Sequence, residues 1–372
     1  MNSINRYILR QLIIATLFVA LVLTALVTLV RSLRLVDFVV SRGLPPSALL
    51  ELTALLLPTF FAIILPIALF TAVLFVYNKL VTDSELVVMR AAGLSHLGLA
   101  KPAILLTAVV TGTTYFLYLY LLPVSYGTFK NLETSFRHNF GSVMLQEGRF
   151  NTPVDGITVY VRAREPDGEL LGIFIHDARD REKPITIMAE RGAVMETENG
   201  RQVVMFDGNR QEVDSDTGRL LLLYFEQNSV DLSMIDETLR WRWREPEERF
   251  LGELLQPADT PHDQAYATNL IAEGHRRLSA PLNVLALVAI ALASLLSGDF
   301  DRRGQMIRVL GAVGCAILLQ SSSLGLANAA AKSLTLIPLL YAVPLAASIT
   351  AVIALFRRRR RRGDTMSMAP AG

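Results

Sequence analysis

The sequence contains few charged residues and a single cysteine. Asp, Glu, Lys and Arg make up 19% of the 372 residues, whereas hydrophobic residues make up 52% and the mean hydropathy is +0.39. Soluble globular domains carry about 25% charged residues, so this balance argues against a purely soluble protein. One cysteine, Cys315, excludes an intrachain disulfide framework.

The sequence also lacks the common motifs of catalysis. It has no G-x-x-x-x-G-K-[ST] loop for nucleotide phosphates, no H-E-x-x-H pair, no G-x-S-x-G elbow and no Cys/His metal spacing. The five histidines are scattered along the chain. We therefore expect a chain that is not an enzyme and holds no cofactor of its own.

Uncharged apolar segments recur six times. Each approaches or exceeds the roughly 20 residues that an α-helix needs to cross the hydrocarbon core of a bilayer. The segments are residues 12–30, 52–78, 102–129, 280–297, 309–331 and 333–356. They predict six transmembrane helices, three before and three after a polar middle. Ion-driven carriers usually place an ionisable group inside a span, and these segments contain none, so a transporter of this sequence would take its energy from a partner.

Basic residues predict the orientation in the membrane. With the N-terminus in the cytoplasm, 14 Lys and Arg flank the spans on the cytoplasmic side, including the six arginines at 357–362. Only four, Arg31, Arg34, Arg42 and Lys332, lie in short loops on the other side. Both termini are thus expected inside and the long middle segment outside, which in a bacterium is the periplasm. Residues 357–372 form a basic cytoplasmic tail, which we interpret as an anchor at anionic headgroups.

The middle segment differs from the rest in charge and in periodicity. Residues 131–277 contain 17 Lys and Arg against 27 Asp and Glu, whereas the remaining residues contain 19 against 7. Short alternating runs separated by Asp-Gly and Asn-Gly turns predict β-strands near 157–161, 171–175, 185–188, 202–206 and 220–225. This spacing favours a sandwich, barrel or jelly roll, followed by an acidic return segment that is helical near its end.

Alternate apolar positions of these strands are candidates for the core of the domain. They are Val159, Val161, Ile173, Ile175, Val203, Met205, Leu221 and Leu223. The same pattern would suit a packed core or an open apolar slot, because both need an apolar lining.

A polar loop between the second and third spans predicts a short cytoplasmic helix at about residues 82–93. Thr82 and Glu85 fit a capping box, and Gly93 fits a helix stop. One interpretation is that Glu85 only caps this helix. The other is a coupling helix like that of an ABC-transporter permease, which would dock on an ATPase through exposed Leu86, Val87 and Met89.

Several motifs, in order along almost the whole chain, resemble the LptF/LptG permease family. They are Arg6-Tyr7-Ile8-Leu9-Arg10, Pro58 with Ile64-Leu65-Pro66, Asp83-Ser84-Glu85 through Gly93-Leu94-Ser95, Glu147-Gly148-Arg149-Phe150, Ala189-Glu190-Arg191-Gly192 and Arg277-Leu278-Ser279-Ala280-Pro281-Leu282. The start of the chain and residues 88–95 are more similar to the LptF branch than to the LptG branch.

The resemblance implies a fold and an assembly. The fold is membrane α plus β: six transmembrane helices with an inserted periplasmic β-jelly roll. Its expected parts are residues 1–130 (spans one to three with the coupling helix), 131–277 (β-jelly roll and helical return), 278–356 (spans four to six) and 357–372 (tail). The chain would be one permease subunit of a lipopolysaccharide exporter in the bacterial inner membrane. Its partners would be an LptG-like permease, an LptB-like ATPase dimer that uses the ATP, an LptC-like bitopic protein and an LptA-like periplasmic bridge, and it would bind no nucleic acid.

The resemblance also implies site residues. Glu85, together with Asp83, Leu86, Met89 and Arg90, would contact the ATPase. Arg31, Arg34 and Lys332 would hold lipopolysaccharide, although interfacial arginines can simply snorkel and a loop lysine can simply be solvated. Val159, Val161, Ile173, Ile175, Val203 and Met205 would line the acyl-chain slot of the β-domain.

Three other interpretations remain open from the sequence. The chain could be the LptG-type partner in the same complex. It could be an ATPase-independent membrane scaffold or sensor whose β-domain binds a periplasmic protein. An intramembrane or periplasmic enzyme is the weakest of the three, because no nucleophile-base or metal constellation is present.

Overall fold

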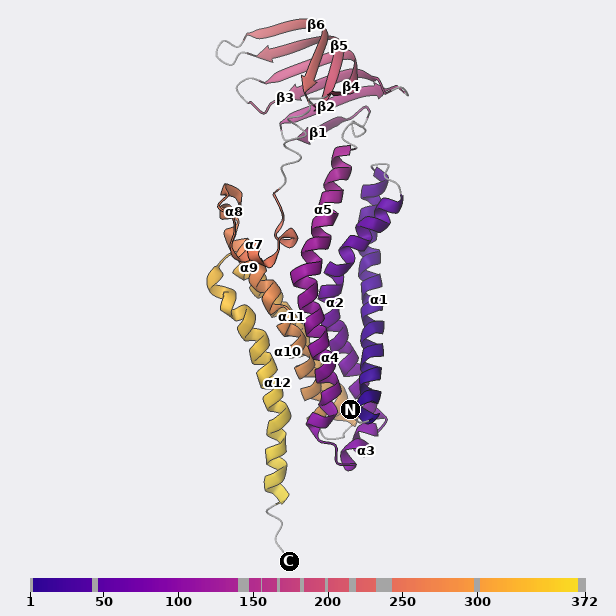
Figure 1. Cartoon of the computed structure of the whole chain (residues 1–372), viewed down its shortest axis with the longest axis vertical. Helices are drawn as coiled ribbons and strands as arrows, with labels where there is room; N and C mark the ends of the chain where they lie inside the picture. The colour runs from indigo at the N-terminus through magenta and orange to yellow at the C-terminus, as the bar shows by residue number, and fades with distance from the viewer. Residues whose placement is uncertain are drawn as a thin grey trace, which may run out of the picture. The chain divides into compact units, whose positions relative to one another are not determined.

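The computed structural model describes residues 3–41, 46–139, 147–154, 156–165, 168–180, 184–197, 200–213, 219–231, 243–297 and 302–366. The chain divides into two compact units (Figure 1). One, the helical unit, comprises residues 1–129 and 244–372, and the other, the β-unit, comprises residues 130–243. The β-unit is therefore an insertion within the sequence of the helical unit.

The first half of the helical unit contains three long helical segments. Helix α1 (Ser3–Ser41) is followed by α2 (Pro46–Thr82) and by the short α3 (Glu85–Ala91). Helix α4 (His96–Phe116) continues through a π-helical turn, η1 (Leu117–Leu121), into α5 (Leu122–Asn139), which leads into the β-unit.

The second half begins with short elements and ends with long helices. They are η2 (Pro246–Glu248), α7 (Leu251–Leu255), α8 (Pro261–Ala265), α9 (Ala267–Ser279), α10 (Leu282–Leu296), α11 (Arg302–Ala330), η3 (Leu334–Leu336) and α12 (Ile337–Met366).

Five helical segments in the described residues are long and apolar enough to cross a membrane. They are Ser3–Leu33, Pro46–Thr82, His96–Ser135, Gly304–Ala330 and Leu334–Phe356. The expected fourth span differs in detail: α10 has only 15 residues, and it passes the same test only together with α9, to which it is joined at a bend of 40°. With that bent pair counted as one span, three spans precede the β-unit and three follow it. The chain is a multi-pass membrane protein.

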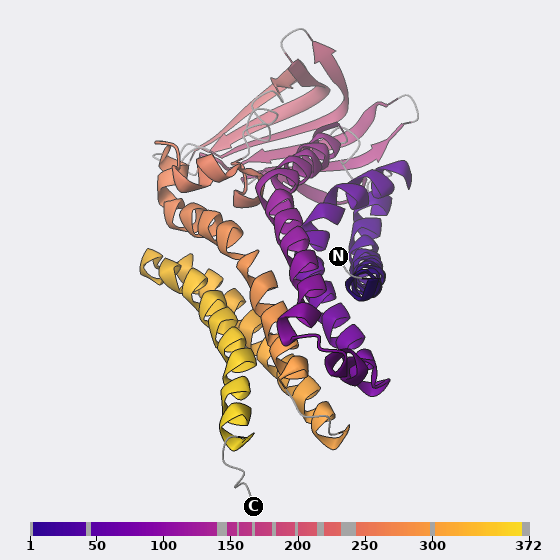
Figure 2. The ribbon, with the colours of Figure 1, turned by 60° about the horizontal axis from the view of Figure 1, so that its bottom comes forward.

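Helices α2 and α10 form the centre of the helical unit. In both views α2, α4 and α10 lie between α1 on one flank and α12 on the other (Figures 1 and 2). Leu69, Tyr77 and Leu80 on α2 and Val284 and Leu296 on α10 are fully buried or nearly so in one apolar core. By contrast, only 11% of the α1 span and 17% of the α11 and α12 spans is buried within this chain. These outer helices therefore present apolar side chains to lipid or to other proteins.

The β-unit contains one antiparallel sheet. Its strands are β1 (Phe150–Val154), β2 (Ile157–Arg164), β3 (Leu170–Asp177), β4 (Ile185–Thr197), β5 (Gly200–Val213) and β6 (Leu220–Asp231). Their order in the sheet is the order of the sequence. The predicted inserted β-domain is confirmed. The described strands form an antiparallel meander, in which each strand pairs with the next one in the sequence.

The sheet reverses its buried face along one line across its strands. On β4, Ile187 and Ala189 are buried, and so is Gly192, whereas Glu190 and Arg191 between them are both exposed. The pairing of β4 with β5 continues without a register shift through this line. Two successive outward residues without a bulge mean that the strand turns a corner there.

Backbone geometry marks the same line on the neighbouring strands. Gly172 on β3 has a φ of 63°, and Asp207 on β5 has a φ of 54°, a left-handed value that is uncommon for a residue with a side chain. Space is also short, because a Cβ on Gly192 would lie 2.6 Å from Ile173 Cδ1 and one on Gly208 would lie 2.3 Å from the Met188 carbonyl oxygen. The Ala189-Glu190-Arg191-Gly192 motif is thus the corner of the fold on β4.

The six predicted core positions lie together. Val159, Val161, Ile173, Ile175, Val203 and Met205 are all buried, at 0 to 8% exposure, in one apolar cluster. The same expectation is wrong for Leu221 and Leu223, which are 61% and 63% exposed. Leu221 and Leu223 pair with Glu212 and Arg210 on β5, and these two charged side chains form an ion pair of 3.2 Å. This ion pair lies between the exposed part of β6 and the strands of the apolar cluster.

A Gly208→Ala substitution tests the corner. We expect it to destabilise the β-unit by about 1–3 kcal/mol, because the added methyl group overlaps a backbone carbonyl that cannot move without distorting β4. Hydrogen exchange of the β5 and β6 amides in the full-length protein would report the loss. Gly112→Ala is the matched control, since a Cβ at that helical position meets nothing within 4 Å. Equal exchange in the two variants would contradict a sterically required glycine.

Candidate functional site

The short helix α3 is held between two well-defined turns. Ser84, at its N-cap, has a left-handed φ of 61°, so the chain reverses sharply after α2. At the other end, Leu94 N donates to Met89 O (3.1 Å) and Gly93 N donates to Arg90 O (3.0 Å), with Gly93 at a φ of 90°. These two bonds form a Schellman motif. The predicted stop at Gly93 is confirmed.

The predicted capping box is wrong. Thr82 belongs to the last turn of α2, where its Oγ1 donates to Asn78 O (2.9 Å), and no side chain bonds to the first amides of α3. The helix is therefore shorter than expected at its N-terminal end. Asp83 is exposed in the turn before it.

Helix α3 has a buried and an exposed face. Leu86 is fully buried in the core of the helical unit, and Met89 packs against the same core. Val87 and Val88 are 38% and 67% exposed. The expectation that Leu86 is exposed is thus wrong, because Leu86 and Met89 are one turn apart on the side that faces α2. Val87 and Val88 are the apolar residues that remain available to a partner.

Glu85 lies at the edge between these two faces. It is half-buried, and Tyr7 Oη on α1 donates to its Oε1 over 3.5 Å. A carboxylate in the first turn of a helix is also favoured by the helix dipole. Glu85 is therefore positioned by α1 but keeps part of its surface open, next to Val88.

Arg90 points inward rather than towards a partner. Its Nη2 donates to Leu296 O (2.6 Å) and lies 3.2 Å from His96 Nδ1. Leu296 is the last residue of α10, so the guanidinium caps a helix C-terminus, where a cation is favoured. This contact is not among those predicted from the sequence. The available signal was that Arg90 falls four residues after Leu86, on the same face of the helix.

The three predicted lipid-binding residues lie on different helices. Arg31 is exposed on α1, near the end of the span Ser3–Leu33, and the backbone of Arg34 follows one turn later. The side chain of Arg34 lies outside the described residues. Lys332 is exposed in the turn between α11 and η3. Because α1 and α12 lie on opposite flanks of the helical unit (Figure 1), the chain does not bring Arg31 and Lys332 together by itself.

Two apolar grooves accompany the outer helices. One, of about 860 Å³, lies between α1 and α2 and includes the side chains of Thr24 and Thr28. The hydroxyl groups of these two threonines are buried and have no hydrogen-bond partner among the described residues. The other, of about 830 Å³, lies among α10, α11 and α12. Both are suited to an apolar occupant.

Exposed ion pairs surround the corner of the β-unit. Arg191 bonds Asp207 (3.0 Å) and lies 4.0 Å from Glu169, so hydrogen bonding to Asp207 raises the pKa of Arg191. At the end of β3, hydrogen bonds from Arg179 lower the pKa of Asp177. These groups stay charged at neutral pH, and among the described residues no three His, Cys, Asp or Glu side chains meet in a way that could hold a metal ion.

These features define a class of protein. The chain is a multi-pass membrane subunit with an inserted β-domain and a short helix fixed to one end of its helical unit. Residues 6–360 match the lipopolysaccharide export system permeases LptF/LptG, and the chain belongs to this family.

Relatives support the same assignment. An uncharacterized protein of Rickettsia prowazekii (strain Madrid E) is 27% identical over 338 residues, which cover 90% of this chain and 92% of that protein. The lipopolysaccharide export system permease protein LptF of Escherichia coli (strain K12) is 27% identical over 215 residues. That match covers 56% of this chain and 58% of the relative.

A pair of substitutions tests the two faces of α3. Leu86→Ala should loosen the helix from the core and speed hydrogen exchange of the amides at 85–92, since burial of a leucine contributes about 2–5 kcal/mol. Val88→Ala should leave exchange unchanged, because the side chain contacts mainly solvent in this chain. Similar exchange in both variants would mean that Leu86 does not hold α3 in place.

Proposed function

We propose that this chain is one of two permease subunits of an ATP-driven lipopolysaccharide exporter in the bacterial inner membrane. The observation that carries the proposal is α3, a seven-residue helix anchored by Leu86 and Arg90 that offers Glu85, Val87 and Val88 to a partner. A separate ATPase dimer, LptB-like in kind, would bind this face and hydrolyse the ATP. Family membership and the relative named LptF support the substrate.

The proposed topology follows from the charges. The N-terminus, α3 and the C-terminal tail would lie in the cytoplasm, and the β-unit in the periplasm, since cytoplasmic loops carry the excess of Lys and Arg. Within the helical unit, the N-terminus of α1 and helix α3 lie at the same end, as Figure 1 shows and the bond from Tyr7 to Glu85 requires.

The outer helices would contact a second permease. The exposed side chains of Phe18 and Leu21 on α1, and of Ile307 and Leu318 on α11, range from 67% to 71% exposure. The hydroxyl groups of Thr24 and Thr28 have no hydrogen-bond partner among the residues that the structure describes. They suit a neighbouring transmembrane helix, because interhelical hydrogen bonds stabilise such contacts. This chain would be the LptF-type subunit, which the relative named LptF supports, and an LptG-like subunit would cover these faces. An LptC-like helix would also pack there.

The proposed lipid path begins at the membrane surface. Arg31, Arg34 and Lys332 would hold phosphate groups of lipid A, for which guanidinium and ammonium groups are suited. In a complex of two permease subunits, α1 of one subunit and α11 of the other would border a common cavity. The position of Arg31 in one subunit would then lie near the position of Lys332 in the other. The acyl chains would then pass to the interior of the β-unit, lined by the cluster that contains Val159, Val161, Ile173, Ile175, Val203 and Met205.

The last strand of the β-unit would carry the lipid onward. Strand β6 is an edge of the sheet, and residues 220–224 on it are apolar and 45–73% exposed. An exposed apolar edge is a template for strand addition from another sheet. We assign this edge to an LptA-like or LptC-like β-domain.

Charge reversal at Glu85 tests the ATPase contact. Glu85→Lys should abolish copurification of the ATPase, because a lysine would face the basic residue that we expect to pair with Glu85. Asp259→Lys is the control: it makes the same change in an exposed residue between α7 and α8. A Glu85→Lys protein that retains the ATPase and supports export would contradict the proposal.

Alanine substitutions test the lipid contacts. Arg31→Ala, Arg34→Ala and Lys332→Ala should each reduce the lipopolysaccharide that copurifies with the complex, because a charge-assisted hydrogen bond contributes about 1.5–3 kcal/mol. Subunit assembly, measured by size-exclusion chromatography, should not change. Unaltered lipid retention in mass spectrometry would show that these side chains only snorkel or are solvated.

A further inference from the structure

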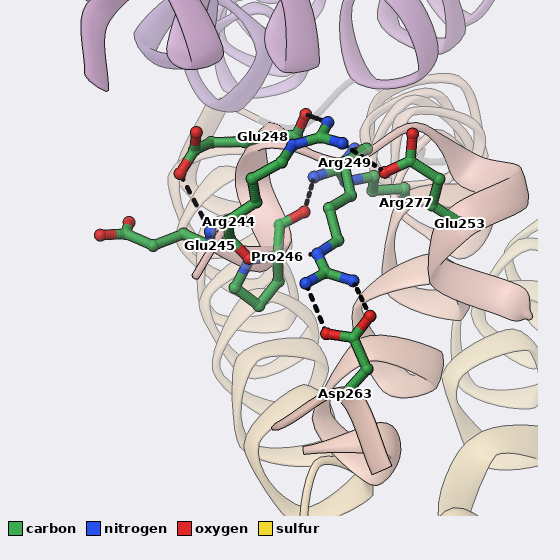
Figure 3. Close-up of polar contacts among 8 residues, drawn as sticks. All are labelled: Arg244, Glu245, Pro246, Glu248, Arg249, Glu253, Asp263 and Arg277. Carbon is green, nitrogen blue, oxygen red and sulfur yellow. Dashed lines mark hydrogen bonds and ion pairs between the residues drawn. The ribbon is translucent and has the colours of Figure 1, made fainter. Parts of the chain in front are cut away.

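The segment that follows the β-unit along the chain is bound by arginine side chains. Residues 244–249 include the helical turn η2, and hydrogen bonds fix it internally: Arg244 Nη2 donates to Glu248 O (2.9 Å), and Glu245 N donates to Glu248 Oε1 (2.9 Å). Figure 3 shows these residues with Arg277 and Asp263, which hold the segment from α9 and α8. We call residues 244–249 the return segment.

Arg277 is the centre of this cluster. Its side chain is fully buried, and its three nitrogens have three different partners: Glu273 Oε1 (2.9 Å), Arg249 O (2.8 Å) and Pro246 O (2.8 Å). Two of these partners are backbone carbonyls of the return segment. A guanidinium is permanently charged and presents its donors in a planar fork, so only an arginine can make this set of contacts.

A second ion pair closes the cluster. Arg249 donates through Nη1 and Nη2 to both carboxylate oxygens of Asp263 (2.8 and 2.6 Å), and these side chains are only 8% and 7% exposed. Nearby, burial raises the pKa of Glu247. The return segment is thus fastened to α9 by Arg277 and to α8 by Asp263.

Helix α9 is in turn fastened to the long helices. Arg276 lies over the Tyr118 ring, 5.5 Å from its centroid, and Tyr115 Oη donates to Leu278 O (3.0 Å). On the other side, His275 Nδ1 and Tyr341 Oη of α12 are 2.9 Å apart. Tyr126 of α5 donates to Glu245 Oε2 (2.9 Å) in the return segment itself. The return segment, α9 and the middle of the third span therefore form one hydrogen-bonded body.

Helix α10 connects the hydrogen-bonded body that contains α9 and the return segment to helix α3. At its C-terminal end α10 is held by Arg90 of α3, and at its N-terminal end it continues into α9 through the 40° bend at Ala280 and Pro281. A displacement of α3 would move α10 through the Arg90 contact. This displacement would reach the return segment only if the contacts between α9 and the return segment are rigid.

We propose that Arg277 is a positioning residue of lipid export, which fastens the return segment to α9 so that movement of α10 is delivered to the chain leading from the β-unit. The inference rests on the proposed function, because it assumes an ATPase that moves α3. Arg277 is fully buried within this chain, so in this assignment it would contact neither the ATPase nor the lipid. Its loss should therefore uncouple ATP hydrolysis from lipid transfer rather than stop hydrolysis.

The test uses the complex of this chain with its ATPase and partner permease, reconstituted in proteoliposomes. Arg277→Gln and the milder Asp263→Asn should leave ATP hydrolysis within about twofold of wild type and lower the lipopolysaccharide released per ATP by about tenfold, since each leaves a buried partner unsatisfied. Arg277→Lys keeps the charge but not the fork, so it should restore the yield only in part. Glu253→Gln is the matched control, because its ion pair with Arg244 in the same cluster is about half exposed.

A second measurement, which needs no lipid, tests whether the return segment is held against α9. Trypsin should cut after Arg249 slowly in wild type, where this residue is 7% exposed, and about tenfold faster in Arg277→Gln. A variant with hydrolysis and transfer reduced in equal proportion, or with wild-type yield per ATP, would overturn this inference alone. A wild-type complex that hydrolyses ATP but releases no lipopolysaccharide would overturn the proposed function and this inference with it.

Discussion

The arrangement of the return segment, α9 and α10 depends on the hydrogen bonds of the buried Arg277 guanidinium. Removing a charged group from water costs several kcal/mol, and the cost is offset only where a carboxylate and well-placed acceptors replace the lost hydration. Here the acceptors are Glu273 on α9 and two carbonyls of the return segment. Neither element can move away without leaving the charge uncompensated. The position at which the chain re-enters the helical unit is therefore set by α9, and the direction of α9 sets that of α10 through the bend.

The β-unit meets a different constraint, which is to bury apolar side chains from a single sheet. A flat six-stranded meander would leave one face exposed over its whole length, but the corner at Gly172, Gly192 and Asp207 brings apolar residues from both sides of the line into one cluster. Glycine or a left-handed backbone conformation is needed at this corner, because the neighbouring strands come so close that an added methyl group would overlap their atoms. The position of this corner along the strands therefore determines both the apolar interior of the β-unit and the exposed end of β6.

Much of this arrangement follows from sequence periodicity, and the failures have physical causes. Long uncharged runs and period-two alternation predicted the spans and the strands, because both depend on burial of whole faces. Leu221 and Leu223 were wrongly placed in the core, since the alternation of β6 does not reveal that Arg210 and Glu212 lie beside it. The capping box failed because Thr82 bonds back to α2. The bonds from Arg90 to Leu296 O and from Arg277 to Arg249 O join residues far apart in sequence, so the helical spacing that turns Arg90 inward does not identify either partner.

The geometry of α3 shows what holds so short a helix to the helical unit. An isolated helix of seven residues would not be stable in water, and α3 persists because Leu86 is inserted into the core and both of its ends are fixed by left-handed turns. Its motion relative to α2 is therefore small, and a partner that pushes on Val87 and Val88 pushes on the helical unit. Arg90 adds a direct bond to α10, which packs against α2, α4, α11 and α12. Because α10 touches all of these helices, it is the element through which a displacement of α3 would spread across the membrane.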